Sequence, residues 1–188
     1  ISGALTVINK IREFALNQPS GNWHSEVALI ADDAANPGNN YAAEISHVQN
    51  SNRIFNILHP YLNITTIYGV DFLPQPTSNW YLLPDMTIKV INTINSGVAL
   101  LNYIGHGSST TWAKEIILDL NRDLNQIADP NGAIWIVGSC SFGSYDTEEA
   151  MTESLLEKPE GAIAIITTTR EIGVSPNFNY LEKLFENI

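Results

Sequence analysis

Residues 133–143 read AIWIVGSCSFG and residues 98–109 read VALLNYIGHGSS, and these two stretches decide the fold. Each is an apolar run, typical of a buried strand, that continues into glycine and small polar residues. The only cysteine of the chain, Cys140, follows the first run, and His106 follows the second. A thiol and an imidazole at matching strand exits predict a site for nucleophilic catalysis.

Similar apolar runs alternate with helix-period segments along the whole chain. We expect strands at residues 27–31, 62–68, 98–104, 133–137 and 162–168. We expect helices at residues 5–15, 42–58, 88–94, 119–128 and 147–157, the last with Thr147 as its N-cap. Residues 36–40 are expected to form a loop, and residues 71–84, which carry three prolines, an irregular connection.

This alternation predicts parallel βαβ units. The strands are apolar on both faces, which favours a sheet covered by helices on each side. We therefore predict one α/β domain over residues 1–188. The first residues, Ile1-Ser2-Gly3, and a helix-like pattern that runs to the last residue lead us to expect a fragment of a longer protein.

Polar residues follow several of the predicted strands. They are Asp32, His106, Cys140 and Thr169-Arg170. Ligands of open parallel sheets bind beyond the carboxyl ends of the strands, where these residues fall. Their clustering is a stronger indication of a site than any one of them.

The composition excludes several classes of function. Nine Lys and Arg against 20 Asp and Glu give a formal net charge of −11, which argues against nucleic acid as a partner. A single cysteine excludes internal disulfides and a cysteine-based structural zinc site. No apolar run approaches the roughly 18 residues of a spanning helix.

Thiol catalysis needs a base for the thiol proton and donors for the oxyanion. His106 can exchange the proton, and the backbone N–H groups of Gly107 and Cys140 can stabilise the oxyanion. Taken alone, a lone cysteine is more often an inert buried side chain, and a lone histidine a satisfied polar residue. The coincidence of both at glycine-rich exits favours catalysis.

We predict no metal site, and we place His47 with Glu44 on a solvated helix face.

The residues around His106 resemble a known family. Residues 102–108, NYIGHGS, followed by Thr111-Trp112, are similar to the catalytic-histidine motif of the gingipain-like cysteine peptidases. The 34 residues from His106 to Cys140 also resemble that family. Residues 139–146, SCSFGSYD, and 167–170, TTTR, resemble its branch of type IX secretion system surface sortases (PorU).

The resemblance implies a caspase-like α/β fold with the His and Cys strands adjacent. It implies His106 as general acid and base and Cys140 as nucleophile. The family's third catalytic residue is a carboxylate after the first strand; the position in register with it holds Ala34, and Asp33 is the candidate that takes its place. It places Glu44 and Arg170 among the substrate-binding residues, but a pocket tryptophan of the gingipains has no counterpart. A strict preference for Arg or Lys is therefore not implied. No cofactor is required, although structural calcium with unassigned ligands is compatible with the family.

Three functions remain open at this stage. The first is a sortase at the bacterial outer-membrane surface that removes a C-terminal secretion signal from cargo proteins. It would join the cargo to a surface lipopolysaccharide, with secretion-system outer-membrane proteins as partners. The second is a secreted gingipain-like endopeptidase that only hydrolyses peptides. The third is a catalytically silent surface interaction module.

Overall fold

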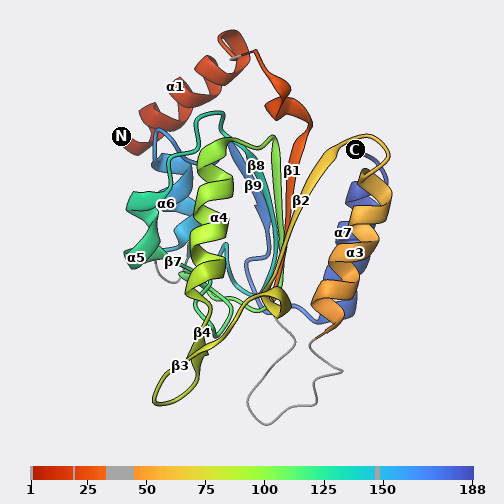
Figure 1. Cartoon of the computed structure of the whole chain (residues 1–188). Coiled ribbons are helices and arrows are strands. Elements are labelled where there is room, and N and C mark those ends of the chain that lie inside the picture. Colours follow the sequence, from red (N-terminus) through yellow and green to blue (C-terminus); the bar gives the residue numbers. More distant parts are fainter. Residues whose placement is uncertain (1, 19, 33–44, 147–148) are drawn as a thin grey trace.

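The computed structural model describes residues 2–18, 20–32, 45–146 and 149–188. Its centre is a five-stranded sheet in the order β2-β1-β5-β8-β9, and all neighbouring pairs are parallel (Figure 1). In this order the strands are β2 (Asn63–Tyr68), β1 (Glu26–Ala31), β5 (Leu100–Ile104), β8 (Ile134–Gly138) and β9 (Ala164–Thr167). The predicted parallel α/β sheet is confirmed.

Helices cover both faces of the sheet, as predicted (Figure 1). One face carries α4 (Pro84–Ser96), α5 (Leu120–Asp123) and α6 (Met151–Glu157), and the other carries α3 (Ser46–Leu58) and α7 (Val174–Phe185). The first helix, α1 (Ser2–Leu16), lies at the amino-terminal edge of the sheet. The three short 3₁₀ helices of the described chain are η1 (Asn22–Ser25), η2 (Gly69–Asp71) and η3 (Leu124–Gln126). None of the described helices is long and apolar enough to cross a membrane.

Successive strand residues alternate between two apolar clusters, because side chains of a strand point to opposite faces. Tyr103 and Trp135 belong to the cluster under α4 and α6, whereas Ile104 and Ile136 belong to the cluster under α3 and α7. All four are at most 1% exposed. The near-continuous apolar strands of the sequence thus serve two cores, one on each side of the sheet.

Some predicted boundaries are wrong. The last predicted helix begins at Met151 rather than residue 147, because Ala150 is its N-cap and the backbone N–H of Ala150 donates to the Glu153 carboxylate at 3.3 Å. Thr147 itself, the loop at residues 36–40 and the expected helix start at residues 42–44 lie outside the described residues.

Two short hairpins were not expected from the sequence. β3 (Gln75–Pro76) pairs with β4 (Tyr81–Leu82) inside the predicted irregular connection. β6 (Thr111–Trp112) pairs with β7 (Leu118–Asp119) after the His106 exit. Two-residue strands are too short to show an alternating pattern, which is why the sequence gives no signal for them.

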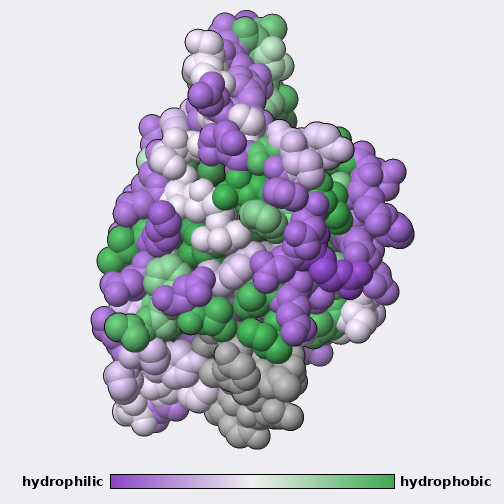
Figure 2. Space-filling model, turned by 45° about the vertical axis from the view of Figure 1, so that its right-hand side comes forward, coloured by the Kyte–Doolittle hydropathy of each residue, from purple (hydrophilic) through white to green (hydrophobic). Residues whose placement is uncertain are grey.

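The apolar face of α1 is turned outward. Leu5, Ile8 and Ile11 are 54%, 60% and 50% exposed. The helix is held from its other side, where the Lys10 ammonium donates to the backbone carbonyls of Leu156 and Lys158 at 2.7 and 2.9 Å. Figure 2 shows hydrophobic residues among hydrophilic ones on the projecting end that this helix forms.

Gly105 is packed too closely to carry a side chain. An added Cβ would lie 2.6 Å from the Asp32 Cβ and would also overlap the Tyr103 hydroxyl. We expect Gly105→Ala to lower the free energy of unfolding by about 1–3 kcal/mol, because the buried neighbours must shift. Thermal and urea unfolding measure the effect. The matched control is Gly173→Ala, whose added Cβ would lie in ordinary contact, 3.5 Å from Pro176; equal stability of the two variants would contradict the prediction.

Candidate active site

The relative position of His106 and Cys140 is set by the pairing of β5 with β8. Ile104, at the end of β5, lies opposite Gly138, at the end of β8. His106 and Cys140 each follow two residues later. The two side chains therefore leave neighbouring parallel strands at the same level, at the carboxyl edge of the sheet. The two predicted residues thus follow neighbouring strand ends, and their catalytic roles stay predictions.

Asp32 supports the backbone at His106. It is 2% exposed, and its carboxylate accepts a hydrogen bond from the His106 backbone N–H at 3.0 Å. The Asp32 N–H donates to the Ile104 carbonyl at 3.0 Å. On the other side, the Tyr103 hydroxyl donates to the His106 carbonyl at 2.7 Å. The buried carboxylate is thus compensated by hydrogen bonding, and the His106 backbone is held from both sides.

His47 is the site residue that the sequence prediction placed wrongly. Its side chain is not on a solvated face but 4% exposed, and its Nδ1 lies 3.9 Å from the Asp32 carboxylate. Its ring meets the His106 ring edge to face, with centroids 5.1 Å apart and planes at 80°. The sequence does hold a signal for this burial: His47, Ser51, Ile54 and Leu58 repeat at helical spacing and are all buried.

Cys140 lies against the loop that follows β9. Its thiol is partly exposed and donates to the Ile172 carbonyl with Sγ and O 3.6 Å apart. Two bonds tie its neighbours to the same loop: the Thr168 hydroxyl donates to the Ser139 carbonyl, and the Ser141 N–H donates to the Arg170 carbonyl at 3.2 Å. The exits of β8 and β9 thus meet around the thiol.

Gly107 lies beside Ser139 of the neighbouring exit. An added Cβ would come 2.8 Å from the Ser139 Oγ. The neighbouring strand exit therefore favours glycine here, in addition to the substrate approach expected from the sequence. The N–H of His106 is donated to Asp32 and that of Ser108 to the Thr111 carbonyl. No backbone acceptor within the described ranges takes the N–H of Gly107 or of Cys140.

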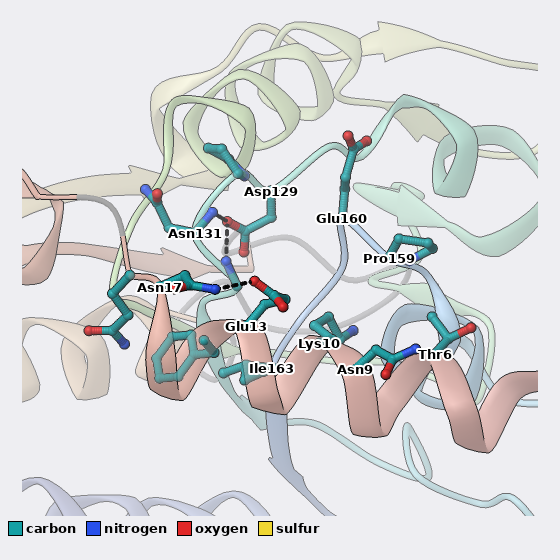
Figure 3. A pocket seen from close by; sticks show the side chains of 14 residues that line it. Thr6, Asn9, Lys10, Glu13, Asn17, Asp129, Asn131, Pro159, Glu160 and Ile163 are labelled. Carbon is teal, nitrogen blue, oxygen red and sulfur yellow. Dashed lines mark hydrogen bonds between the residues drawn. The ribbon is translucent and has the colours of Figure 1, made fainter.

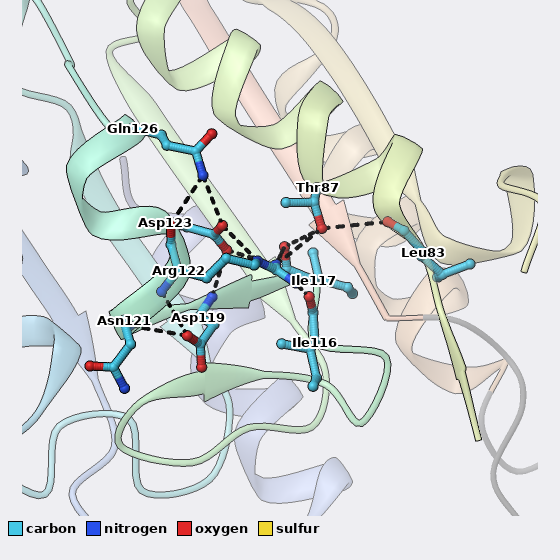
Figure 4. Close-up of polar contacts among 9 residues, drawn as sticks. All are labelled: Leu83, Thr87, Ile116, Ile117, Asp119, Asn121, Arg122, Asp123 and Gln126. Carbon is cyan, nitrogen blue, oxygen red and sulfur yellow. Dashed lines mark hydrogen bonds and ion pairs between the residues drawn. The ribbon is translucent and has the colours of Figure 1, made fainter. Parts of the chain in front are cut away.

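The loop after His106 is anchored in the core and by ionic contacts. The Trp112 and Tyr103 rings stack in parallel, with centroids 4.2 Å apart. Further along the loop, Arg122 donates to the Ile116 carbonyl at 2.7 Å and pairs with the buried Asp123 carboxylate at 2.7 Å (Figure 4). The hydrogen bond to Asp123 raises the pKa of Arg122. These contacts hold the loop that follows Gly107.

The remaining predicted residues are placed as follows. Arg170 pairs its guanidinium with the Asp146 carboxylate at 2.7 and 3.1 Å, and both are exposed. The hydrogen bond from Arg170 lowers the pKa of the Asp146 carboxyl. Arg170 therefore links the β9 exit to the loop beyond Cys140, and its contact with substrate stays a prediction. Asp33 and Glu44 lie outside the described residues.

The side chains near His106 do not fit calcium. Within the described ranges, one group of at least three His, Cys, Asp or Glu side chains has ligand atoms within 4.8 Å of one another, and it consists of Asp32, His47 and His106. Calcium takes six to eight oxygen ligands, whereas two of these three ligands are imidazoles. The calcium compatible with the family stays a prediction for other residues.

A pocket of about 690 Å³ lies at the opposite edge of the sheet, between α1 and the loops that lead into β8 and β9. Figure 3 shows Lys10 and Glu13 of α1 facing Asp129 and Glu160 across it. The pocket is far from the carboxyl ends of the strands and shares no lining residue with the His106 and Cys140 exits. It takes no part in the chemistry considered for those residues.

Comparisons with known proteins agree with this geometry. Gingipain R2 and gingipain R1 of Porphyromonas gingivalis are each 26% identical to the chain over 156 residues, 78% of its length. The chain spans only 19% and 14% of those proteins.

Two solved structures share the fold. They are the Arg-specific cysteine proteinase gingipain R (TM-score 0.74, 23% identity) and the complex of the RgpB pro- and mature domains of Porphyromonas gingivalis (TM-score 0.69, 21% identity). Each match covers 97% of this chain and 41% or 42% of the other. The predicted caspase-like arrangement is thereby confirmed as that of a gingipain. The sequence profile of peptidase family C25 matches residues 1–188, and the chain belongs to this family of cysteine peptidases.

Proposed function

We propose that this chain is the thiol-bearing catalytic domain of a cysteine peptidase that acts on protein substrates. The observation that carries the proposal is the register of β5 and β8, which presents His106 and Cys140 at the same level of one sheet edge. Family membership independently favours the same chemistry. A silent interaction module would have no need for both side chains at paired exits.

In this mechanism His106 takes the thiol proton, and the Cys140 thiolate attacks the carbonyl carbon of the scissile peptide bond. His106 then returns the proton to the leaving amine as the acyl-enzyme forms. A water molecule or another amine resolves the thioester, with His106 again exchanging the proton. Asp32 acts on this scheme as a positioning residue, through its bond to the His106 backbone. Asp33 stays a candidate for the third catalytic residue.

The oxyanion hole is assigned to the backbone N–H groups of Gly107 and Cys140. The amides on either side of Gly107 are already donated within the protein, which leaves its own N–H available to substrate. Removing one oxyanion donor typically slows the chemical step by about 10²–10³-fold. The close packing of Gly107 against Ser139 fixes the direction of this donor.

We further propose that the acyl-enzyme is used for transpeptidation. The residues around Cys140 and Arg170 resemble the surface sortases of the type IX secretion system, which favours cleavage of a C-terminal secretion signal. Transfer to an amine of a surface lipopolysaccharide would place the protein at the outer-membrane surface, beside secretion-system outer-membrane proteins. The alternative is a secreted endopeptidase with the same thioester, resolved by water. The shared fold with the Arg-specific proteinase gingipain R does not decide between them.

Replacing the nucleophile tests the mechanism directly. We expect Cys140→Ala to abolish covalent labelling by peptidyl chloromethyl ketones, because no other thiol is present in the chain. The melting temperature should change by less than about 3 °C, since a partly exposed thiol makes a minor packing contribution. Intact-mass spectrometry and thermal unfolding measure the two effects. Labelling or turnover that persists in Cys140→Ala would refute the role of the thiol.

Replacing the histidine tests the proton transfer. We expect His106→Gln to slow acylation of Cys140 by about 10²–10⁴-fold, the usual contribution of general acid–base catalysis. The rate is followed by stopped-flow or quenched-flow detection of the leaving group released from an arginyl and an alanyl peptide ester. His59→Gln is the matched control, because His59 is exposed and stacks on Phe55 away from the site. Equal rates in the two variants would remove His106 from the scheme.

Amine capture distinguishes transpeptidase from endopeptidase. A cargo C-terminal segment is incubated with the protein and an added amine, with Cys140→Ala as control, and the products are weighed by mass spectrometry. A Cys140-dependent product that carries the amine is expected, because an amine resolves the same thioester as water. Hydrolysed product without captured amine would favour the endopeptidase.

A further inference from the structure

The cluster beside the thiol site has the composition of a transition-metal site. Asp32, His47 and His106 each offer one ligand atom, and these atoms lie within 4.8 Å of one another. Ligand atoms of a tetrahedral zinc site, about 2.0–2.2 Å from the ion, are roughly 3.3–3.5 Å apart. The cluster therefore has to contract by about 1.5 Å or less, a movement within reach of side-chain rotation.

The three ligands come from different elements that the fold already holds together. Asp32 follows β1 and makes two hydrogen bonds at the carboxyl end of β5. Its backbone N–H donates to the Ile104 carbonyl, and its carboxylate accepts from the His106 N–H. His47 lies in the first turn of α3 with its ring buried, at 3.9 Å from the Asp32 carboxylate. The His106 backbone is fixed by the Tyr103 hydroxyl. A site assembled on rigid elements loses little conformational entropy when an ion binds.

Two imidazoles and one carboxylate select the kind of ion. Zn²⁺ and its neighbours Co²⁺ and Ni²⁺ bind such nitrogen and oxygen sets, whereas Ca²⁺ and Mg²⁺ prefer oxygen ligands throughout. With three protein ligands, a fourth position stays open to water. The net charge of −11 also favours the approach of a cation.

We propose that Asp32, His47 and His106 form a reversible Zn²⁺ site that switches the peptidase off. A ring nitrogen of His106 that is bound to the ion cannot accept the Cys140 proton, so the acylation step stops. Binding uses neutral imidazoles and an ionised carboxylate, and it involves no oxidation or reduction. The inhibitory consequence rests on the proposed function, whereas binding of the ion does not.

Binding is measured first in the full chain carrying Cys140→Ala, so that no thiolate can act as a ligand. Isothermal titration with Zn²⁺ should show about one ion per chain, and Co²⁺ should give the visible absorption of a low-coordinate site. Added Ca²⁺ should not displace the ion. Failure to bind Zn²⁺ or Co²⁺ would overturn the proposal, whether or not the protein is an active peptidase.

Ligand variants locate the site. In the same background, His47→Gln and Asp32→Asn should each weaken Zn²⁺ binding at least about tenfold, in the range that loss of a metal-site contact produces. His59→Gln, at the other end of α3, should bind as the parent does. If either buried variant fails to fold by circular dichroism, His106→Gln takes its place, because this side chain is only half-buried. Unchanged affinity in the folded variants would refute the assignment.

Inhibition is measured in the protein with Cys140 present, by labelling with a chloromethyl ketone in increasing Zn²⁺. The half-inhibitory concentration should match the dissociation constant found with Cys140→Ala, and chelation with EDTA should restore labelling. For His47→Gln, labelling rates are normalised to the rate of the same variant without Zn²⁺. The half-inhibitory Zn²⁺ concentration of this variant should be at least about tenfold higher than that of the parent protein. Inhibition that does not depend on His47 would show direct binding to the thiolate and would overturn the switch.

Discussion

The parallel pairing of β5 with β8 is the constraint on which the site depends. A parallel ladder fixes both the spacing and the stagger of two strands, so whatever follows the pair Ile104 and Gly138 starts from a common level. His106 and Cys140 are 34 residues apart in the chain, yet each lies two residues beyond the same rung of the ladder. A slip of one residue would turn every side chain of one strand to the opposite face of the sheet and would shift one of the two exits along the sheet.

Close packing at the exits of β5 and β8 makes it difficult to shift one exit relative to the other. Gly105 has no room for a Cβ beside Asp32, and Gly107 has none beside Ser139. The polar groups that such packing buries are offset by hydrogen bonds, as when the Asp32 carboxylate accepts the N–H of His106. The Trp112 ring, stacked on Tyr103, closes the same region from the core side. The position of the catalytic backbone is therefore a property of the core as much as of the loops.

The sequence predicts the sheet because strands buried on both faces appear in it as continuous apolar runs. Four of the five strands are near-continuous apolar runs, whereas β2, which reads NITTIY at the edge of the sheet, is recognised by its β-branched residues. Contacts between distant segments produce no comparable local pattern in the sequence. The bond between Asp32 and His106 spans 74 residues, and only the rule that strand ends share an edge points to it. The three-residue spacing of Glu44 and His47 in the sequence predicts a solvated face, whereas the longer helical repeat through Ser51 and Ile54 indicates burial.

The surroundings of His106 place two demands on one ring. Catalysis requires a nitrogen lone pair that is free to accept the thiol proton, and it benefits from buried polar neighbours that keep the ring in place. Those neighbours are a carboxylate and a second imidazole, which are also the ligands that a zinc-class ion seeks. The Asp32 carboxylate accepts a hydrogen bond from the His106 backbone N–H, which uses one of the carboxylate lone pairs. This bond weakens the attraction of the carboxylate for an ion. The affinity for an ion thus depends on how far the ligand atoms of Asp32, His47 and His106 must move toward one another. A large movement would leave the cluster as a support for the catalytic ring, whereas a small one would allow it to bind Zn²⁺ and inhibit the peptidase.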